Sequence, residues 1–398
     1  MILRDEALKI FLAGLDVANP SQLLASYFSL NPDLFNKIES YNKLNNKIFV
    51  FSLGKAAFFM AKSFFEIFPN SEGFVFTKED HLVKEDPFYH IKNWIFREGT
   101  HPIVSELNVQ VTHEVILWTK KLKPGDLFVT LLSGGGSALF EIPILGLSIE
   151  ELIKIHLKLL NSSLSINEIN EERKKISSVK GGQFLQYLPE DTSLMTLALS
   201  DVIGDDPNTI ASAPTYPGSE YHIIGNLKKS LLASRDKAIQ LGYHTIVLSD
   251  KWNQDAKETG KILSQWCLEN KWDITSVKED KIAIIIGGEM VTKVLGNGIG
   301  GRNQEATLSF AIWAHKLKLK NVTFLSAGTD GTDGPTDVAG ACVSEETYLQ
   351  LVKAGIDPLK ELDMSNSFYA LNKISAHIKT GPTGTNVNDI LILLISDL

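Results

Sequence analysis

The chain has 398 residues, of which 44% are hydrophobic and 22% charged, and its formal net charge is −8. This length and composition are typical of a globular protein with about two domains. The acidic balance argues against a general binder of nucleic acid or of anionic membranes, because such a protein needs a basic face.

The first twenty residues have the pattern of an amphipathic helix. Asp5, Glu6 and Lys9 interrupt the first ten positions, so we do not expect a secretory signal peptide. The longest apolar runs, such as 281–286 and 390–395, are far too short to span a bilayer. We therefore expect a cytoplasmic protein with no membrane partner.

Short apolar runs alternate with helical patterns along most of the chain. The expected strands are 47–53, 72–77, 94–97, 126–132, 193–199, 245–248, 281–286, 322–326 and 390–395. The clearest expected helices are 56–67, 105–122, 149–160 and 304–316, and the segment 252–272 also has a helical pattern. This alternation predicts parallel α/β sheets covered by helices. We place the boundary between two domains near 217–219, which gives domains of residues 1–218 and 219–398.

Four of the expected strands end in loops that are rich in glycine or aspartate. These loops read FSLGKAA (51–57), LLSGGGSA (131–138), LALSDVIGDDPN (197–208) and LSAGTDGTDGPTD (325–337). In open α/β sheets, ligands bind beyond the carboxyl ends of the strands. The four loops therefore predict one shared ligand-binding cleft.

The run of three glycines indicates an anion site. The loop consists of Ser133, Gly134, Gly135, Gly136 and Ser137, between a strand and the start of a helix. Such a loop presents bare backbone N–H groups, which suit phosphate or carboxylate. It matches neither the P-loop nor a strict GxGxxG. A tight strand–helix turn without a ligand is the alternative.

Basic residues in similar positions are candidates for the same cleft. Lys55 stands directly after a strand, at the start of a helix, where it can meet phosphate. Arg302 follows paired glycines, and its planar fork suits a carboxylate or a phosphate. In the basic run 173–180, Lys180 precedes two glycines and is the residue that we most expect to turn inward. The alternative for each is a solvated surface charge.

Aspartates at two strand ends suggest a metal bound to substrate. Asp201, Asp205 and Asp206 cluster in one turn-rich loop. Carboxylates grouped in this way can hold Mg²⁺ that is bound to phosphates. The alternative is that they form Asx turns and cap a helix, which explains one aspartate easily and three less well. In the loop at 325–337, which carries Asp330, Asp333 and Asp337, Asp330 is closest to the strand end and is the best candidate of the three to line the cleft. Its neighbourhood does not fit the spacing of a calcium loop.

Six motifs occur along the chain in the order LLSGGGSAL, INEERKKISSVKGGQ, SDVIGDDPNTIASAPT, GGRNQEATL, SAGTDGTDGPTDVAGA and TGPTGTNVNDI. Together they resemble the class II glycerate kinases, also called glycerate 2-kinases, from about residue 47 to the C-terminus. Some relatives have carried the label hydroxypyruvate reductase. The resemblance implies two α/β domains, the first Rossmann-like with a parallel sheet and the second with a mixed sheet. It also implies an active site in the cleft between them.

The resemblance further implies an enzyme that transfers phosphate from ATP, with Mg²⁺, to the C2 hydroxyl of D-glycerate, giving 2-phospho-D-glycerate. The implied catalytic residues are Lys55, Arg302 and Asp201, and the implied metal ligands are Asp201 and Asp205. Nucleotide or phosphate would be bound by Ser133, Gly134, Gly135, Gly136, Ser137 and Lys180. Substrate would be bound by Glu289, Asn303, Gln304 and Asp330.

Two positions depart from the usual pattern of this family. The basic block reads Arg173-Lys174-Lys175 instead of Arg-Lys-His, and Thr100 replaces the usual glycine before His-Pro in EGTHPIVSE. We expect neither change to abolish activity, although either could alter affinity.

Two other functions are consistent with parts of the sequence. An NAD(P)H-dependent hydroxypyruvate reductase would need GxGxxG and an acidic residue about twenty positions later, and the chain shows no convincing set. A non-catalytic protein that binds nucleotides or metabolites is the other alternative, and the intact set of Lys55, Asp201 and Arg302 argues against it. We expect no nucleic-acid partner and either a monomer or a homodimer.

Overall fold

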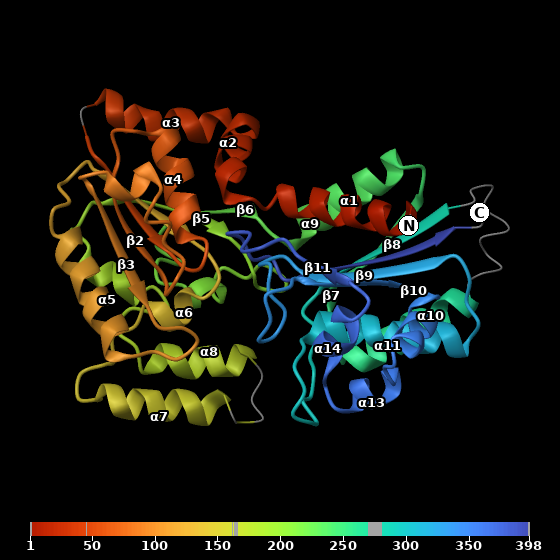
Figure 1. Cartoon of the computed structure of the whole chain (residues 1–398). Helices are drawn as coiled ribbons and strands as arrows, with labels where there is room; N and C mark the ends of the chain where they lie inside the picture. Colours follow the sequence, from red (N-terminus) through yellow and green to blue (C-terminus); the bar gives the residue numbers. More distant parts are fainter. Residues whose placement is uncertain (1, 45, 161, 163–165, 270–280, 397–398) are drawn as a thin grey trace. The chain divides into compact units, whose positions relative to one another are not determined.

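The chain forms two compact α/β units, drawn in Figure 1 from a computed structural model that describes residues 2–44, 46–160, 162, 166–269 and 281–396. The first, which we call the N-terminal unit, consists of Asn19–Asn226 and Gly384–Asn386. The second, the C-terminal unit, consists of Met1–Ala18, Leu227–Thr383 and Val387–Leu398. Across the described residues, every helix is too short or too polar to cross a lipid bilayer.

The N-terminal unit is built on a six-stranded sheet in which all neighbouring strands are parallel. Its order is β3-β2-β1-β4-β5-β6. The strands are β1 (Ile48–Leu53), β2 (Glu72–Lys78), β3 (Trp94–Gly99), β4 (Leu127–Leu132), β5 (Ser193–Leu199) and β6 (Glu220–Gly225). This is the doubly wound Rossmann order, in which the winding reverses between β1 and β4. Ligands bind at that reversal, beyond the carboxyl ends of the strands.

Helices and aromatic side chains cover this sheet. The helices are α2 (Pro20–Leu30), α3 (Pro32–Lys43), α4 (Ala57–Ile67), α5 (Glu106–Thr119), α6 (Gly136–Leu139), α7 (Ile149–Leu160) and α8 (Ile166–Lys175), with 3₁₀ turns at Pro87–His90, Gln183–Tyr187 and Ile210–Ser212. Both β1 and β4 are buried at every position, as the near-continuous apolar sequence of a central parallel strand predicts. Phe51 packs against Phe140 and Phe184 at ring-centroid distances of 5.1 and 6.0 Å, so the start of the segment after α6 is anchored in the core.

The C-terminal unit is built on a six-stranded mixed sheet of order β11-β10-β9-β12-β8-β7. The strands are β7 (His244–Trp252), β8 (Lys281–Gly288), β9 (Val322–Gly328), β10 (Gly340–Ser344), β11 (His377–Ile378) and β12 (Asp389–Ser396). β7 and β8 are parallel, whereas β12 runs antiparallel to both β8 and β9. The expected pairing of a Rossmann-like domain with a second, mixed-sheet α/β domain is therefore confirmed.

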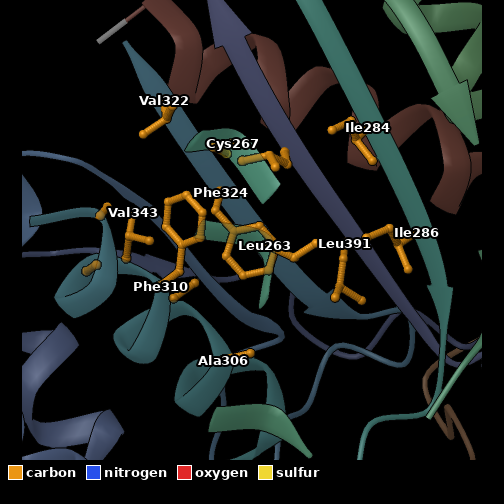
Figure 2. Close-up of a cluster of buried hydrophobic side chains, with 14 of the residues drawn as sticks. Leu263, Cys267, Ile284, Ile286, Ala306, Phe310, Val322, Phe324, Val343 and Leu391 are labelled. Carbon is orange, nitrogen blue, oxygen red and sulfur yellow. The ribbon is translucent and has the colours of Figure 1, made fainter. Parts of the chain in front are cut away.

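Helices lie on both faces of the mixed sheet, as Figure 1 shows. They are α1 (Ile2–Asp16), α9 (Leu227–Gln240), α10 (Ala256–Glu269), α11 (Arg302–Lys316), α12 (Thr347–Lys353), α13 (Pro358–Asp363) and α14 (Ser367–Asn372). One face packs against α1 and α9 and the other against α10 and α11. Figure 2 shows the second of these cores, where Phe310 of α11 lies 5.0 Å from Phe324 of β9 between ring centroids. This core fixes the axis of α11, whose first residue is Arg302.

The bounds of the units differ from those expected, 1–218 and 219–398. The N-terminal helix α1 belongs to the C-terminal unit, because Ala7, Ile10 and Phe11 are buried against α9 and the mixed sheet. The edge strand β6 belongs to the N-terminal unit, because it pairs with β5. In the expected helix at 252–272, the described helix is Ala256–Glu269, Trp252 ends β7, and residues 270–272 lie outside the described residues.

Candidate active site

Three sequence-predicted residues or loops of the N-terminal unit come together at the carboxyl ends of β1, β4 and β5. The backbone N–H of Lys55 donates to the carbonyl of Gly134 at 2.8 Å. A Cβ placed on Gly134 would collide with the carboxylate of Asp201, and one on Gly135 would lie 3.2 Å from Cγ of Lys55. Lys55 and Asp201 therefore both lie against the glycine-rich loop.

Glycine is required in this loop for two physical reasons. Gly135 has φ +87°, a left-handed conformation that side chains rarely adopt, and Gly134 leaves no room for a Cβ beside Asp201. Ser137, at the far end, accepts a hydrogen bond from Ser212 Oγ at 2.8 Å and remains partly exposed. The bare backbone predicted from the sequence is thus present, with a carboxylate on one side and a lysine on the other.

Ser133 has a structural position, which corrects the prediction that its hydroxyl faces a ligand. The residue is buried, with 2% of its surface exposed. Its Oγ donates to the carbonyl of Leu53 at 3.2 Å and accepts from the backbone N–H of Ala56 at 3.1 Å. Both partners lie in the turn that carries Lys55, so Ser133 ties that turn to the glycine-rich loop.

One basic residue that the sequence did not mark as a site candidate lies at the same edge of the sheet. His101, after β3, has its Nε2 3.2 Å from the place a Cβ on Gly135 would take. Burial, together with the positive charges of Lys55 and Lys78, lowers the pKa of His101 to about 4. The signal available in the sequence was a polar strand end, TKEDH across the end of β2 and EGTH across the end of β3, but neither carries the glycine cluster that marked the other loops.

The three aspartates of the β5 loop have three different environments. Asp205 accepts a hydrogen bond from Asn226 Nδ2 at 2.5 Å. Asp206 accepts from the backbone and side chain of Asn208 at 3.0 and 3.1 Å, which is an Asx turn. Only Asp201 is shown against the glycine-rich loop.

The carboxylates fit Mg²⁺ only as an ion that is already bound to phosphate. Within the described residues, no group of three or more histidine, cysteine, aspartate or glutamate side chains is placed to hold a metal. Mg²⁺ commonly binds proteins through one or two carboxylates, with substrate phosphates and water completing its octahedron. Asp201 at the loop is compatible with that arrangement.

Lys180 turns inward as predicted, but the structure gives its ammonium an internal partner. The residue is 1% exposed, and Nζ donates to Glu141 Oε2 at 2.6 Å and to the carbonyl of Phe140 at 3.0 Å. Burial lowers the pKa of Lys180 and the Glu141 carboxylate opposes that change. This geometry corrects the expectation of a direct phosphate contact: Lys180 instead anchors the segment that follows α6.

Arg302 in the C-terminal unit has a guanidinium that is paired with two carboxylates. Nε and Nη2 donate to the two oxygens of Asp389 at 2.7 and 3.1 Å, and Nη1 donates to Glu289 Oε1 at 3.0 Å. The Asp389 and Glu289 charges raise the pKa of Arg302, which burial alone would lower. Glu289 is half exposed whereas Asp389 is fully buried, so the outer edge of the guanidinium is the one that faces solvent.

Asn303 and Gln304 are buried, which corrects the prediction that they bind substrate directly. Both of their backbone N–H groups and both side-chain amides donate to the carboxylate of Asp333, at 2.9–3.2 Å. Asp333 therefore caps the N-terminus of α11 and fixes the residues after Arg302. Asp330 is partly exposed, and its Oδ1 accepts from the backbone N–H of Thr332 at 3.0 Å.

A small pocket opens beside the start of α11. Its volume is about 160 Å³, and its lining includes Gly300, Gly301, Ser367 and Glu305. Burial raises the pKa of Glu305 to about 7, and nearby Lys257 opposes the change. Glu305 also accepts a hydrogen bond from the hydroxyl of Thr292.

The fold and these residues define an α/β protein whose N-terminal unit presents cations, a carboxylate and bare backbone N–H groups at the strand-order reversal of a Rossmann-like sheet. Residues 6–229 match the family model described as "Domain of unknown function (DUF4147)", and residues 282–389 match the MOFRL family. The chain is 37% identical over 396 residues to D-glycerate 2-kinase from Thermotoga maritima, covering 90% of this chain and 93% of that protein.

Other relatives match most or all of the chain. Glycerate 2-kinase from Pyrococcus horikoshii is 31% identical and is covered to 98%, with 100% of this chain matched. A putative hydroxypyruvate reductase from Agrobacterium vitis is 31% identical over 87% of this chain and 86% of its own length. The crystal structure of glycerate kinase from Thermotoga maritima superposes with a TM-score of 0.86 at 35% identity, covering 99% of both chains. The chain belongs to the class II glycerate kinase family.

Proposed function

We propose that the protein is a glycerate 2-kinase, which transfers the terminal phosphoryl group of ATP to the C2 hydroxyl of D-glycerate and releases 2-phospho-D-glycerate. The observation that carries the proposal is the convergence of Lys55 and Asp201 on the bare backbone of Gly134 and Gly135. It occurs in a chain that matches a D-glycerate 2-kinase over 90% of its length.

The geometry suits the demands of phosphoryl transfer. Its transition state spreads negative charge over the phosphoryl oxygens, so catalysis depends on positioning and on fixed positive charge. Lys55 would supply that charge, since within the described residues its ammonium has no ion-pair partner, and the backbone of Gly134 and Gly135 would approach the phosphates closely. Asp201 would hold Mg²⁺ on the nucleotide phosphates and is the best candidate to accept the proton of the C2 hydroxyl. Mg²⁺, when bound, neutralises charge on those oxygens.

Arg302 is the proposed cation of the C-terminal unit. Its ion pair with the buried Asp389 fixes the plane of the guanidinium, while Nη1 is paired with the half-exposed Glu289. A substrate carboxylate or phosphate would take the place that Glu289 now occupies at Nη1. In this proposal Asp389, Asn303 and Gln304 position Arg302 and do not contact substrate.

The direct test is phosphorus NMR of the product formed from ATP, Mg²⁺ and D-glycerate. A resonance coupled to the C2 proton shows phosphorylation at O2, and this is the expected result. Formation of 3-phosphoglycerate would contradict the class of kinase proposed, and a spectrum that contained only ATP would contradict kinase activity altogether.

A second activity deserves one control, because a relative from Agrobacterium vitis is named as a putative hydroxypyruvate reductase. Its cofactor would bind at the first strand–helix turn, yet that turn reads SLGKAA and lacks the GxGxxG spacing. Absorbance at 340 nm with hydroxypyruvate and NADH or NADPH, without ATP, separates the two activities. We expect no loss of the reduced cofactor.

A further inference from the structure

Within the described residues, three side-chain nitrogen donors near the glycine-rich loop lack protein partners. Lys55 and the imidazole of His101 lie against Gly135, and the charge of Lys78 acts on His101. Across the part of the chain that the structure describes, none of the three takes part in a side-chain hydrogen bond or ion pair. Arg302 and Lys180 contrast with them, because carboxylates already neutralise both. Unpaired donors that are half buried at one place require an anion or water to satisfy them.

The parallel register explains why these donors meet. Leu53, the last residue of β1, lies opposite Phe76 of β2 and Leu132 of β4, and Lys78 lies opposite Gly99 of β3. The four strands therefore end at one edge of the sheet, and each supplies one group to it. His101 is two residues beyond β3, and its Nε2 lies over Gly135.

We propose that His101 is an anion-binding residue of this site, whose Nε2 contacts the same phosphate or carboxylate group as the ammonium of Lys55. The inference rests on the proposed function, because the loop must bind the oxyanion of a reactant. Phosphate of ATP, phosphate of 2-phosphoglycerate and the carboxylate of glycerate share this chemistry. The titrations described below, which use a separate probe for each anion, distinguish these three ligands.

The charges around His101 predict how its protonation responds to the ligand. The charged groups that act on the ring are Lys55 beyond β1, Lys78 at the end of β2 and His81 beyond β2, all positive or capable of becoming so. Burial, together with these charges, lowers the pKa of His101 to about 4 and keeps the free imidazole neutral at pH 7. An oxyanion beside the ring reverses the sign of the local field and raises the pKa of His101, so binding is accompanied by proton uptake. Affinity for the oxyanion therefore rises as the pH falls from 8 towards 6.

The experiment compares His101→Ala, His101→Gln and the matched control His113→Ala by isothermal titration calorimetry. His113 is an exposed histidine on α5 of the same unit. The probes are 2-phosphoglycerate, D-glycerate and a non-hydrolysable ATP analogue with Mg²⁺, each titrated at pH 6 and pH 8 in buffers of different ionisation enthalpy. Far-UV circular dichroism checks that each variant is folded. If His101→Ala does not fold, His101→Gln, which keeps an uncharged hydrogen-bond donor, replaces it in the comparison.

We expect His101→Ala to bind one probe about ten- to a hundredfold more weakly at pH 6, as the loss of a charge-assisted hydrogen bond predicts. His113→Ala should bind all three probes with the affinities of the native protein. The probe that is weakened identifies the anion. His101→Gln should bind with intermediate affinity and lose both the pH dependence and the proton uptake. Affinities of His101→Ala that equal those of the native protein for all three probes would overturn the inference. Native protein that binds the probes but fails to phosphorylate glycerate in the NMR assay would instead refute the proposed function.

Discussion

Arg302 donates two hydrogen bonds to Asp389, from Nε at 2.7 Å and from Nη2 at 3.1 Å, and the aspartate is completely buried. A buried carboxylate depends on such a partner, because removing one member of the pair leaves an uncompensated charge in the interior. Within the described residues Lys55 forms no ion pair, so removing its ammonium leaves no buried carboxylate without a partner. The two proposed cations therefore differ in what they contribute to the folded state.

The first prediction concerns Lys55→Ala. We expect kcat to fall about a hundred- to a thousandfold, as the loss of a group that stabilises transition-state charge predicts, while the unfolding temperature stays the same. Lys92→Ala, which removes an exposed lysine of the same unit, is the control. Steady-state kinetics and thermal unfolding test both statements. Wild-type kcat/KM in folded Lys55→Ala would remove Lys55 from the site.

The second prediction concerns Arg302→Lys, which keeps the charge and loses the planar fork. Asp389 would keep its hydrogen bond from Asn303 Nδ2 and at most one from residue 302, so we expect the free energy of unfolding to fall by about 1–3 kcal/mol together with activity. Glu289→Gln, at the half-exposed side of the same guanidinium, should change stability by less than about 1 kcal/mol. Urea denaturation of the three proteins measures the difference. Equal midpoints for Arg302→Lys and native protein would mean that the pair with Asp389 does not stabilise the fold.

The place of Lys55 and Asp201 in the fold, beside the glycine-rich loop, was largely predictable from local sequence. Parallel strands end at one edge of a sheet, so the glycines and aspartates that follow them indicated where Lys55 and Asp201 would lie. Those patterns depend only on residues within a few positions of one another, and the structure has the strand ends and glycine turns that they predict.

The roles of several individual side chains depended on distant partners and were not predictable in this way. Asn303 donates to an aspartate 30 positions later, and Lys180 pairs with a glutamate 39 positions earlier. No local pattern reveals that a polar residue beside a glycine pair is already satisfied inside the protein. His101 was missed for the opposite reason, because the strand end before it contains no glycine cluster and only the sheet register brings it to Gly135.

The third prediction tests whether Lys180 is structural. Lys180→Met leaves Glu141 buried without its partner, and we expect a loss of about 3–5 kcal/mol in the free energy of unfolding. The double variant Lys180→Met/Glu141→Leu removes both charges and should recover most of that loss. Lys175→Met, which breaks an exposed pair with Glu172, is the control and should cost less than about 1 kcal/mol. A stable double variant with a greatly raised KM for ATP would restore Lys180 to the nucleotide site.

The fourth prediction separates backbone strain from site geometry in the glycine-rich loop. Gly135 and Gly146 have nearly the same positive φ, +87° and +89°. A Cβ on Gly135 would press on Lys55 and His101 at 3.2 Å, whereas one on Gly146 would meet nothing within 4 Å. Both alanine variants should therefore lose about 1–2 kcal/mol of stability, but only Gly135→Ala should lose activity. An equal loss of kcat in the two would show that strain alone is responsible.

The last prediction uses the buried carboxyl of Glu305, whose side chain is 4% exposed. Burial raises the pKa of Glu305 in the folded state to about 7, from an ordinary value of 4.5. Between these two values the folded protein holds a proton that the unfolded chain has released. Stability from this group is therefore complete below about pH 4.5 and is lost as the pH rises through 7, by roughly 3 kcal/mol in total.

Glu305→Gln should remove this dependence, because the amide does not titrate, and should make the protein more stable than the native chain at pH 8. Glu258→Gln, on the exposed side of α10, should leave the native pH profile unchanged. Urea denaturation at half-unit intervals from pH 5 to pH 8 gives the three profiles. Parallel curves of unfolding free energy against pH for native protein and Glu305→Gln would contradict this prediction. They would show that burial does not raise the pKa of Glu305 above its ordinary value.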